Sequence, residues 1–403
     1  MAIEAEVNPK EAPQTWDRVR TLQALSGELR ALPVAIALIV LGIFFSSQSN
    51  VFLTSRNLSN LLLQSVDTGI VALGIIFVLL IAEIDLSVAA TSGVVSVFMS
   101  RLIVESGWSP VAAIVVAVLV GLAIGVAAGR WTTWFGVPSF VVTLGLGLVL
   151  NGVQRILLPQ SGRYNLLNTG VEKIAGSFIP PVWSWLVLAV SVILLLVLRY
   201  VKYQAKRRAG VDNSLLTDVG LPVGGATAVG AVAVAVLNGY QGIPLAVLIF
   251  VGLIGVAGYV TNETKFGLYL YAVGGNIEAA RRVGINIQRV KMSAFGIAGA
   301  LAGFAGVVAA SRILGVSVSS GGGIGGGRLL LEAIASAVIG GVSLFGGRGR
   351  VSAALLGALV LGTVSNGLNL MGVADEVKLI VTGLLLVGAV SFDHLIERMG
   401  HSG

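Results

Sequence analysis

The side chains that could perform chemistry are few. The chain has no cysteine, which excludes thiolate catalysis, disulfides and cysteine metal sites. Its two histidines, His394 and His401, lie close to the C-terminus, so a histidine metal site or proton relay deeper in the chain is excluded as well. Three acidic residues, Glu83, Asp85 and Glu332, instead fall within or beside long apolar runs. We therefore predict no catalytic residue and no metal or cofactor site.

Glu83 and Asp85 stand two positions apart at the end of an apolar run. A charge at mid-bilayer costs roughly 2.5–3.5 kcal/mol on insertion scales, so such residues rarely lack a role. Since residues two apart cannot share a helix face, one helix is expected to end near Glu83, and the next to begin with Asp85 or Ser87 as its N-cap. The alternative is a discontinuous helix that lines a translocation pathway, to which Glu332 would also contribute by facing the bundle interior.

A polar stretch between two apolar runs predicts a short helix over 277–283. Asn276 is a suitable N-cap, Glu278 and Arg282 are spaced i, i+4, and Gly284 supplies the C-terminal stop. The helix dipole favours an acidic residue in the first turn and basic residues in the last. The sequence places these at Glu278, Arg281 and Arg282.

A helix this short is marginal in water, since isolated helices need about 12–15 residues. It must therefore pack against something. The small side chains of Ala279 and Ala280 would let it approach a groove on a partner closely. These residues alone leave open whether it enters such a groove or packs only against its own chain.

The composition is that of a membrane protein. The 403 residues are 56% hydrophobic and only 11% charged, whereas a soluble domain carries about a quarter charged residues. Apolar runs near the 20 residues needed to cross a bilayer recur throughout. The predicted fold is an all-α bundle with about twelve membrane spans (10–12). These are 31–48, 59–82, 86–105, 109–129, 138–158, 182–200, 220–238, 243–262, 291–311, 329–345, 351–370 and 376–395.

The basic residues orient this bundle. Cytoplasmic loops are enriched in Lys and Arg. With both termini in the cytoplasm, 18 of the 26 basic residues fall on the inner side and 8 on the outer side or at outer helix ends. This asymmetry accounts for the net charge of +7, so no nucleic-acid partner is expected.

The predicted spans and their orientation divide the chain into two tails and one membrane domain. Residues 1–30 are polar, lack the features of a signal peptide and are predicted to form a cytoplasmic tail. The membrane domain covers 31–395, with a basic cytoplasmic linker at 199–219 and a polar cytoplasmic loop at 263–290. Residues 396–403 form a second cytoplasmic tail.

A run of glycines at 321–327 precedes Arg328. It lacks the Lys-Ser/Thr ending of a phosphate-binding loop. We expect an outer loop or a re-entrant turn there.

The stretch Glu278-Ala279-Ala280, followed three residues later by Gly284, resembles the EAA-x-x-x-G loop of ATP-binding-cassette importer permeases. In that family the loop forms the coupling helix, which docks in a cleft of the ATP-binding subunit. The resemblance implies that the following residues contact that subunit: Gly275, Asn276, Glu278, Ala279, Ala280, Arg281, Arg282, Gly284, Ile285 and Asn286.

Four further segments are similar to the ribose/xylose branch of sugar permeases, so the resemblance covers roughly residues 50 to 395. They are 84–88 (Ile-Asp-Leu-Ser-Val), 137–145, 333–347 and 366–368. The glutamate before Ile-Asp-Leu-Ser and the chain length are most similar to the xylose permeases. Two departures concern the sugar more than the family, namely Ala89 where glycine is usual and Leu330-Leu331-Glu332 where Glu-Leu-Asp is usual.

The resemblance implies a non-enzymatic transport subunit of the cytoplasmic (inner) membrane, surrounded by lipid, that translocates xylose or a related pentose or hexose. It implies a homodimer, an ATP-binding subunit that holds the ATP and Mg, and an extracytoplasmic sugar-binding protein. The alternatives are an ion- or proton-coupled secondary transporter, which would need more buried acidic or histidine residues, and a branched-chain amino-acid permease. An intramembrane enzyme lacks candidate catalytic residues.

Overall fold

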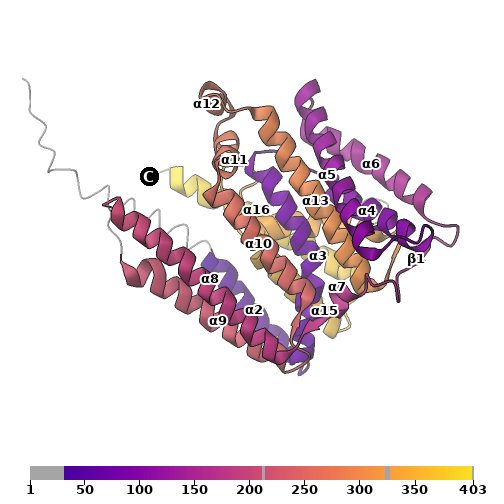
Figure 1. Cartoon of the computed structure of the whole chain (residues 1–403), viewed down its shortest axis with the longest axis horizontal. Coiled ribbons are helices and arrows are strands. Elements are labelled where there is room, and N and C mark those ends of the chain that lie inside the picture. Colours follow the sequence, from indigo (N-terminus) through magenta and orange to yellow (C-terminus); the bar gives the residue numbers. More distant parts are fainter. Residues whose placement is uncertain (1–30, 211–213, 323–326, 402–403) are drawn as a thin grey trace, which may run out of the picture.

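The computed structural model describes residues 31–210, 214–322 and 327–401. These residues form a helical bundle, and a helix coincides with each predicted span (Figure 1). The tail 1–30, the linker residues 211–213, residues 323–326 of the glycine-rich run and residues 402–403 lie outside the described part. The helices on the predicted spans are α2 (Ala31–Gln48), α3 (Ser55–Leu80), α4 (Val88–Val104), α5 (Pro110–Phe135), α6 (Ser139–Leu157), α8 (Pro181–Arg208), α9 (Leu221–Asn238), α10 (Leu245–Glu263), α13 (Ile287–Ile313), α14 (Gly327–Ile339), α15 (Ala353–Leu370) and α16 (Asp375–His401).

Eight helices of the described residues are long and apolar enough to cross a membrane. The polytopic helical membrane fold is thereby confirmed, whereas the count of twelve crossings and the side of the termini remain predictions. α14, which coincides with one of the twelve predicted spans, is short for a membrane-crossing helix. Its 13 residues extend about 20 Å at 1.5 Å per residue, which is shorter than the roughly 30 Å hydrocarbon core.

Several helix ends differ from the predicted boundaries, and three of them change the extent of a predicted linker, tail or span. α8 continues to Arg208, so the first half of the basic linker is helical, and a π-helical turn, Leu216–Gly220, leads into α9. α16 continues to His401 and takes in most of the predicted C-terminal tail. α14 ends at Ile339 rather than at 345 because Gly341 adopts a left-handed conformation at φ 97°.

α13 is the central helix and lies between α3 and α5 (Figure 1). Its contact with α5 is a seam of glycines on both helices. A methyl group added at Gly125 would overlap the Phe295 carbonyl, and one at Gly299 would overlap the Gly121 carbonyl. Small residues at such positions let two helix backbones approach closely, which is how helices associate where lipid is as apolar as their side chains.

α8 and α9 form a hairpin set apart from this core (Figure 1). Of the 28 residues of α8, only Ser184 is buried, and apolar side chains such as Val190 and Leu194 are more than half exposed. Exposed apolar surface on this scale fits contact with lipid.

Two small antiparallel pairings join loops at the end of the bundle where α13 finishes. β1 (Arg163–Asn165) pairs with β4 (Gly315–Ser317), with Tyr164 opposite Val316. β2 (Phe178–Ile179), which follows the short helix α7 (Lys173–Gly176), pairs with β3 (Ile243–Pro244). These strands are the exception to the all-α prediction.

Candidate functional site

The predicted short helix is present as α12 (Ile277–Arg282), which follows α11 (Lys265–Gly275). The Asn276 side chain accepts a hydrogen bond from the Ala279 amide at 2.9 Å, and Gly284 has φ 84°, so both predicted ends are confirmed. The ion pair is different from the predicted one. Glu278 pairs with Arg281 at 2.9 Å, three residues away, and not with Arg282.

α12 has an anchored face and an exposed face. Ala280 is buried against the chain's own core, with Ile277 and Ile285 partly buried beside it. The methyl group of Ala280 therefore fills an intrachain contact and does not lie on the outer face, while the docking of α12 on a partner stays a prediction. The outer face exposes charged and small side chains. It consists of Glu278, Ala279, Arg281, Arg282 and Val283.

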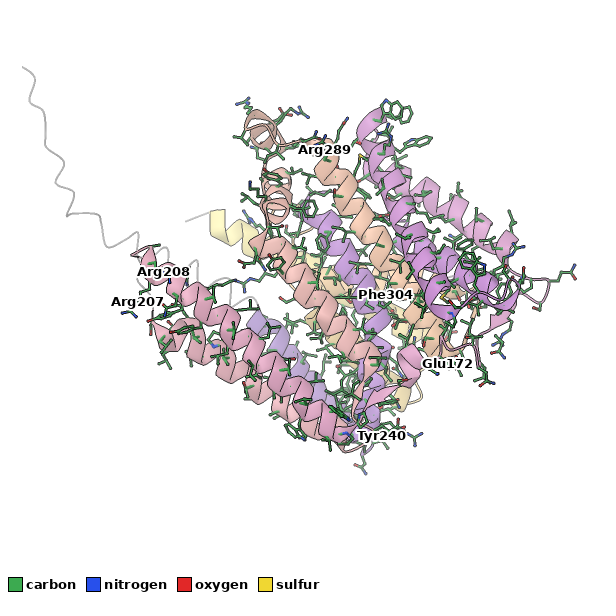
Figure 2. All side chains as sticks on the ribbon, viewed as in Figure 1. Glu172, Arg207, Arg208, Tyr240, Arg289 and Phe304 are labelled. Atoms are coloured by element: carbon green, nitrogen blue, oxygen red, sulfur yellow. The ribbon has the colours of Figure 1, made fainter. Side chains whose placement is uncertain are left out.

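Two features around α12 suit contact with another protein. Val283 is 76% exposed, so an apolar side chain is accessible at the C-terminal end of the helix. A groove of about 380 Å³ runs beside the helix between α11 and α13, lined by Tyr269, Asn286 and Arg289 among others. Arg289 lies next to α12 at one end of the molecule, whereas Glu172 and Tyr240 lie near the other end (Figure 2). Asn286 also caps α13, since its side chain accepts from the Arg289 amide at 3.0 Å.

The end of α11, which leads directly into the base of α12, contacts the end of α3 through glycine. The Gly347 amide donates to the Leu80 carbonyl at 3.1 Å. A methyl group at Gly274 would overlap the same carbonyl, and Gly347 packs against the backbone of Gly275. Movement of α12 would therefore reach the end of α3 directly through backbone contacts.

The chain between α3 and α4 is the predicted break, and other parts of the molecule hold its backbone. Ala82 has φ 58°, which a non-glycine residue rarely adopts. Asp85 accepts hydrogen bonds from both the amide and the hydroxyl of Ser87, at 2.8 and 2.6 Å. Asp85 thus holds Ser87, the residue that directly precedes α4, by two hydrogen bonds. Ser87 occupies the N-cap position without a capping hydrogen bond of its own side chain.

Two side chains from α6 accept hydrogen bonds from two further amides of this break. The Ile84 amide donates to the Ser139 hydroxyl at 3.2 Å, and the Leu86 amide donates to Thr143 at 3.0 Å. Non-helical backbone at membrane depth needs such partners, because lipid offers none. The motifs at 84–88 and 137–145 are therefore two sides of one contact.

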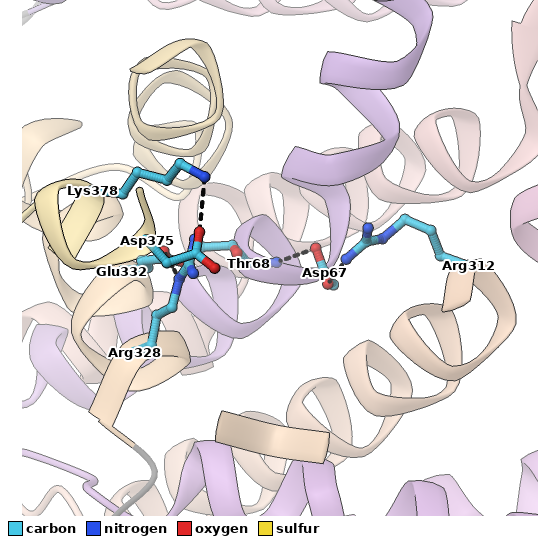
Figure 3. Close-up of polar contacts among 7 residues, drawn as sticks. All are labelled: Asp67, Thr68, Arg312, Arg328, Glu332, Asp375 and Lys378. Atoms are coloured by element: carbon cyan, nitrogen blue, oxygen red, sulfur yellow. Dashed lines mark hydrogen bonds and ion pairs between the residues drawn. The ribbon is translucent and has the colours of Figure 1, made fainter. Parts of the chain in front are cut away.

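Two ion pairs connect α13 to α3 and to the break beyond it. Near the start of α13, Lys291 pairs with Glu83, and both side chains are mostly buried. Near its end, Arg312 Nη2 lies 3.0 Å from Asp67 Oδ2 (Figure 3). The two helices are thus joined by opposite charges close to both ends of α13.

The second of these pairs lines a polar cavity of about 340 Å³ between α3, α13, α14 and α15. Across it, Arg328 Nε pairs with Glu332 Oε1 at 2.9 Å. A third pair, Asp375–Lys378 in α16, lies beside Arg328 (Figure 3). The neutral polar residues of the lining are Gln64, Ser65, Thr68, Ser365 and Asn369.

The predicted pathway residues do not all meet. Glu332 faces the bundle interior as expected and lines the cavity, whereas Glu83, Asp85 and Ser87 belong to the break at the other end of α3. Asp67 was not among the predicted residues. An acid in the middle of the apolar run 59–82 was the signal for it, since intramembrane carboxylates usually face an interior or a partner.

A helical membrane bundle with a short, exposed capped helix at one end and a charged cavity in its interior is compatible with a transport permease. Residues 57–390 match the family described as branched-chain amino acid transport system / permease component. The chain belongs to this family.

Three relatives refine this placement. The xylose transport system permease protein of Escherichia coli K12 is 33% identical over 298 residues, which cover 73% of this chain and 75% of that protein. The corresponding protein of Haemophilus influenzae is 31% identical over 304 residues, 73% of this chain and 79% of the relative. The ribose import permease protein of Escherichia coli K12 is 31% identical over 291 residues, 72% and 71%. No solved structure matches the chain.

The resemblance inferred from the motifs is therefore confirmed at the level of the family and of its sugar-permease relatives. Together with the apolar helices, it makes the chain a multi-pass protein of the cytoplasmic membrane.

Proposed function

We propose that this chain is the membrane-spanning permease subunit of an ATP-binding-cassette importer for a monosaccharide, with xylose or a related pentose or hexose as the sugar. The family supports a permease. The names of the relatives give xylose, ribose and allose as their substrates. A branched-chain amino-acid permease is the second candidate, because the family description itself names that substrate.

α12 carries the proposal because it is anchored on one face and open on the other. Ala280 fixes it to the core, while Glu278 and Arg281 stand more than 60% exposed on the outer face. A short capped helix that is held this way can transmit a push to the end of α3 through Gly274. We therefore assign the docking of a separate ATP-binding subunit, which would hold the ATP and Mg, to this surface.

Charge reversal tests this docking. Glu278→Arg places a third positive charge on the exposed face beside Arg281 and Arg282, and we expect it to remove the ATP-binding subunit from the purified complex. Glu376→Arg is the matched control, since Glu376 is exposed in the first turn of α16, away from α12. Affinity purification of the tagged permease with its co-expressed ATPase measures both variants. Equal ATPase recovery from Glu278→Arg and wild type would overturn the assignment.

The transported solute is tested with the complete importer in proteoliposomes. Uptake of labelled D-xylose, D-ribose, D-allose and L-leucine is measured with ATP inside and the binding protein outside. ATP-dependent uptake of a sugar supports the proposal. ATP-dependent uptake of leucine alone would favour the amino-acid candidate, and uptake driven by an ion gradient without ATP would favour a secondary transporter.

The pathway role of Glu83, Asp85, Ser87 and Glu332 is also a proposal. The capping contacts around the break favour a structural role for Asp85 and Ser87. Glu83→Gln and Asp85→Asn variants that still assemble separate the two interpretations. Normal sugar uptake by both variants would leave only the structural role.

The remaining parts of the importer follow from the same proposal. A second copy of this chain would complete the permease as a homodimer, and a sugar-binding protein would deliver the solute from outside. Sugars are neutral, so the permease would contact them through polar side chains and aromatic faces. The test of the dimer is the mass of the purified permease in detergent.

A further inference from the structure

We propose that the cavity between α3, α13, α14 and α15 is a transit site for a neutral polyhydroxylated solute, entered from the extracytoplasmic side. This inference rests on the proposed function, because it names the place where the imported sugar would pause inside the permease.

The direction and length of α13 show where the cavity lies relative to α12. This helix begins beside α12, the surface assigned to the ATPase, and Arg312 is its second-last residue. Its 27 residues extend about 40 Å at 1.5 Å per residue. Arg312 therefore lies at the end of α13 far from α12, and its partner Asp67 lies near the middle of α3. The cavity that they line thus occupies the half of the bundle away from α12, on the side from which a solute arriving from outside would enter.

The charges of the cavity balance. Asp67 and Glu332 contribute two negative charges, and Arg312 and Arg328 contribute two positive charges. A site for an anion or a cation would carry an excess of the opposite sign. This lining instead offers donors and acceptors with no net charge, which suits hydroxyl groups, since each hydroxyl both donates and accepts.

The two ion pairs leave hydrogen-bonding capacity for a ligand. Each guanidinium has five N–H donors, and a single guanidinium nitrogen contacts the carboxylate in each of the two ion pairs. The side chains remain reachable, since Arg312 is 32% and Arg328 is 42% exposed. A sugar hydroxyl can therefore bridge a guanidinium and a carboxylate without breaking the pair.

The size and lining favour a small polar solute over an apolar one. A cavity of about 340 Å³ falls within the roughly 300–1,000 Å³ range of small-molecule sites. Nine of its thirteen lining residues are polar or charged, and the only large apolar side chains are Leu329 and Leu361. A branched aliphatic side chain would find little apolar surface here, so the lining favours a sugar over leucine.

One side of the cavity is formed by α3 and α13, and the other side by α14 and α15. Asp67 and Arg312 belong to the tightly packed α3–α13 pair. Ser365 and Glu332 belong to α15 and α14, which are joined by residues 340–352. Gly347 of that connection contacts the end of α3 next to the base of α12. A shift of α12 can thus reach the α14–α15 side of the cavity.

The experiment uses the native chain's lack of cysteine. Ser365→Cys is nearly isosteric and places one thiol in the cavity lining. The complete importer in proteoliposomes is treated with benzyl methanethiosulfonate after folding, so that bulk is added without a folding defect. We expect the modification to lower D-xylose uptake by about an order of magnitude, dithiothreitol to restore it, and excess D-xylose to slow the labelling.

Ser191→Cys is the matched control, because Ser191 is exposed on the lipid-facing helix α8. Its modification should leave uptake unchanged. Normal uptake by fully modified Ser365→Cys, verified by mass spectrometry, would overturn the transit site while the unmodified importer still supports the proposed function. Protection by L-leucine but not by D-xylose would overturn the polyol assignment. Failure of the unmodified importer to take up any sugar would overturn both proposals.

Discussion

Single hydroxyl groups hold the break between α3 and α4. Thr143 Oγ1 accepts from the Leu86 amide at 3.0 Å and itself lies within hydrogen-bond distance of the Ser139 carbonyl, at 2.9 Å. Because this amide lies where lipid and protein exclude water, loss of the hydroxyl leaves it unpaired. A buried donor without a partner costs about 1–3 kcal/mol.

We therefore predict that Thr143→Val destabilises the permease by about 1–3 kcal/mol, seen as a lower thermal midpoint in detergent. Thr227→Val is the control, because the Thr227 hydroxyl donates only to the Val223 carbonyl of its own helix. That variant should keep the wild-type midpoint. Equal midpoints for both variants would show that the α6 contact does not stabilise the break.

A second residue-scale contact joins the end of α4 to β1. The Tyr164 hydroxyl donates to the Glu105 carboxylate, and this hydrogen bond lowers the pKa of Glu105 below its usual value. Burial and the nearby carboxylate raise the pKa of Tyr164 from 10.0 to about 12. The folded protein therefore keeps this phenol neutral where the unfolded chain ionises it.

The sign of the pH dependence follows. The stabilisation from neutral Tyr164 is complete below pH 10.0 and is lost as pH rises to about 12. The measurement is the tyrosinate absorbance of the wild type minus that of Tyr164→Phe, followed against pH. We predict that this difference, which reports Tyr164 alone, develops near pH 12 rather than near pH 10. Glu105→Gln should move that transition to lower pH. A Tyr164 transition at its ordinary pKa in the wild type would contradict the buried contact.

At the scale of helices, the glycine seam between α5 and α13 determines how closely the central helices pack. A methyl group at Gly125 would overlap the Phe295 carbonyl oxygen, which is backbone and cannot rotate away. Overpacking of this kind typically costs about 1–3 kcal/mol. Gly252 of α10 has open space around it, so alanine there meets nothing within 4 Å.

We predict that Gly125→Ala lowers the thermal midpoint of the detergent-solubilised permease and that Gly252→Ala does not. Alanine in an open helical position can even stabilise by about 0.5–1 kcal/mol. Circular dichroism at 222 nm against temperature measures both variants. A Gly125→Ala midpoint at or above that of Gly252→Ala would mean that the seam is looser than the structure shows.

The helices themselves were largely predictable, because hydropathy over about 20 residues reflects the bilayer directly. α12 was predictable for another reason: its caps, Asn276 and Gly284, are local signals. The end of α14 was missed because the run 329–345 stays apolar beyond Gly340 and Gly341, where the helix stops.

The cavity could not be predicted from the sequence. Asp67 and Arg312 are separated by 245 positions, and nothing in one sequence indicates that they meet. The same holds for the amides of Ile84 and Leu86, whose partners on α6 are 55 and 57 positions away. The sequence shows that charged residues lie within apolar runs. Only the packing of α3 against α13 shows which residue each of them pairs with.

At the scale of the whole molecule, the orientation of the bundle joins the two proposals. α12 must face the cytoplasm to meet an ATPase, and the cavity must then open toward the outside. The α8–α9 hairpin is the part of the bundle least fixed by packing, because so few of its residues are buried against the core. Its basic end carries Arg207, and its other end carries Tyr240 (Figure 2).

We predict that single cysteines at the two ends of the bundle label from opposite sides of the membrane. Glu278→Cys and Arg207→Cys should react with a membrane-impermeant maleimide only in inside-out vesicles, since positive charge is retained in the cytoplasm. Ser161→Cys and Tyr240→Cys should react in intact spheroplasts. The unmodified chain, which has no cysteine, supplies the background.

The four positions separate the possible errors. If Arg207→Cys alone labels from outside, the hairpin does not cross as proposed, but α12 and the cavity keep their sides. If Glu278→Cys labels from outside, the whole bundle is inverted, and α12 could not meet a cytoplasmic ATPase. That result would overturn the docking surface, and with it the argument that a solute enters at Asp67 and Arg312 from the side of the binding protein.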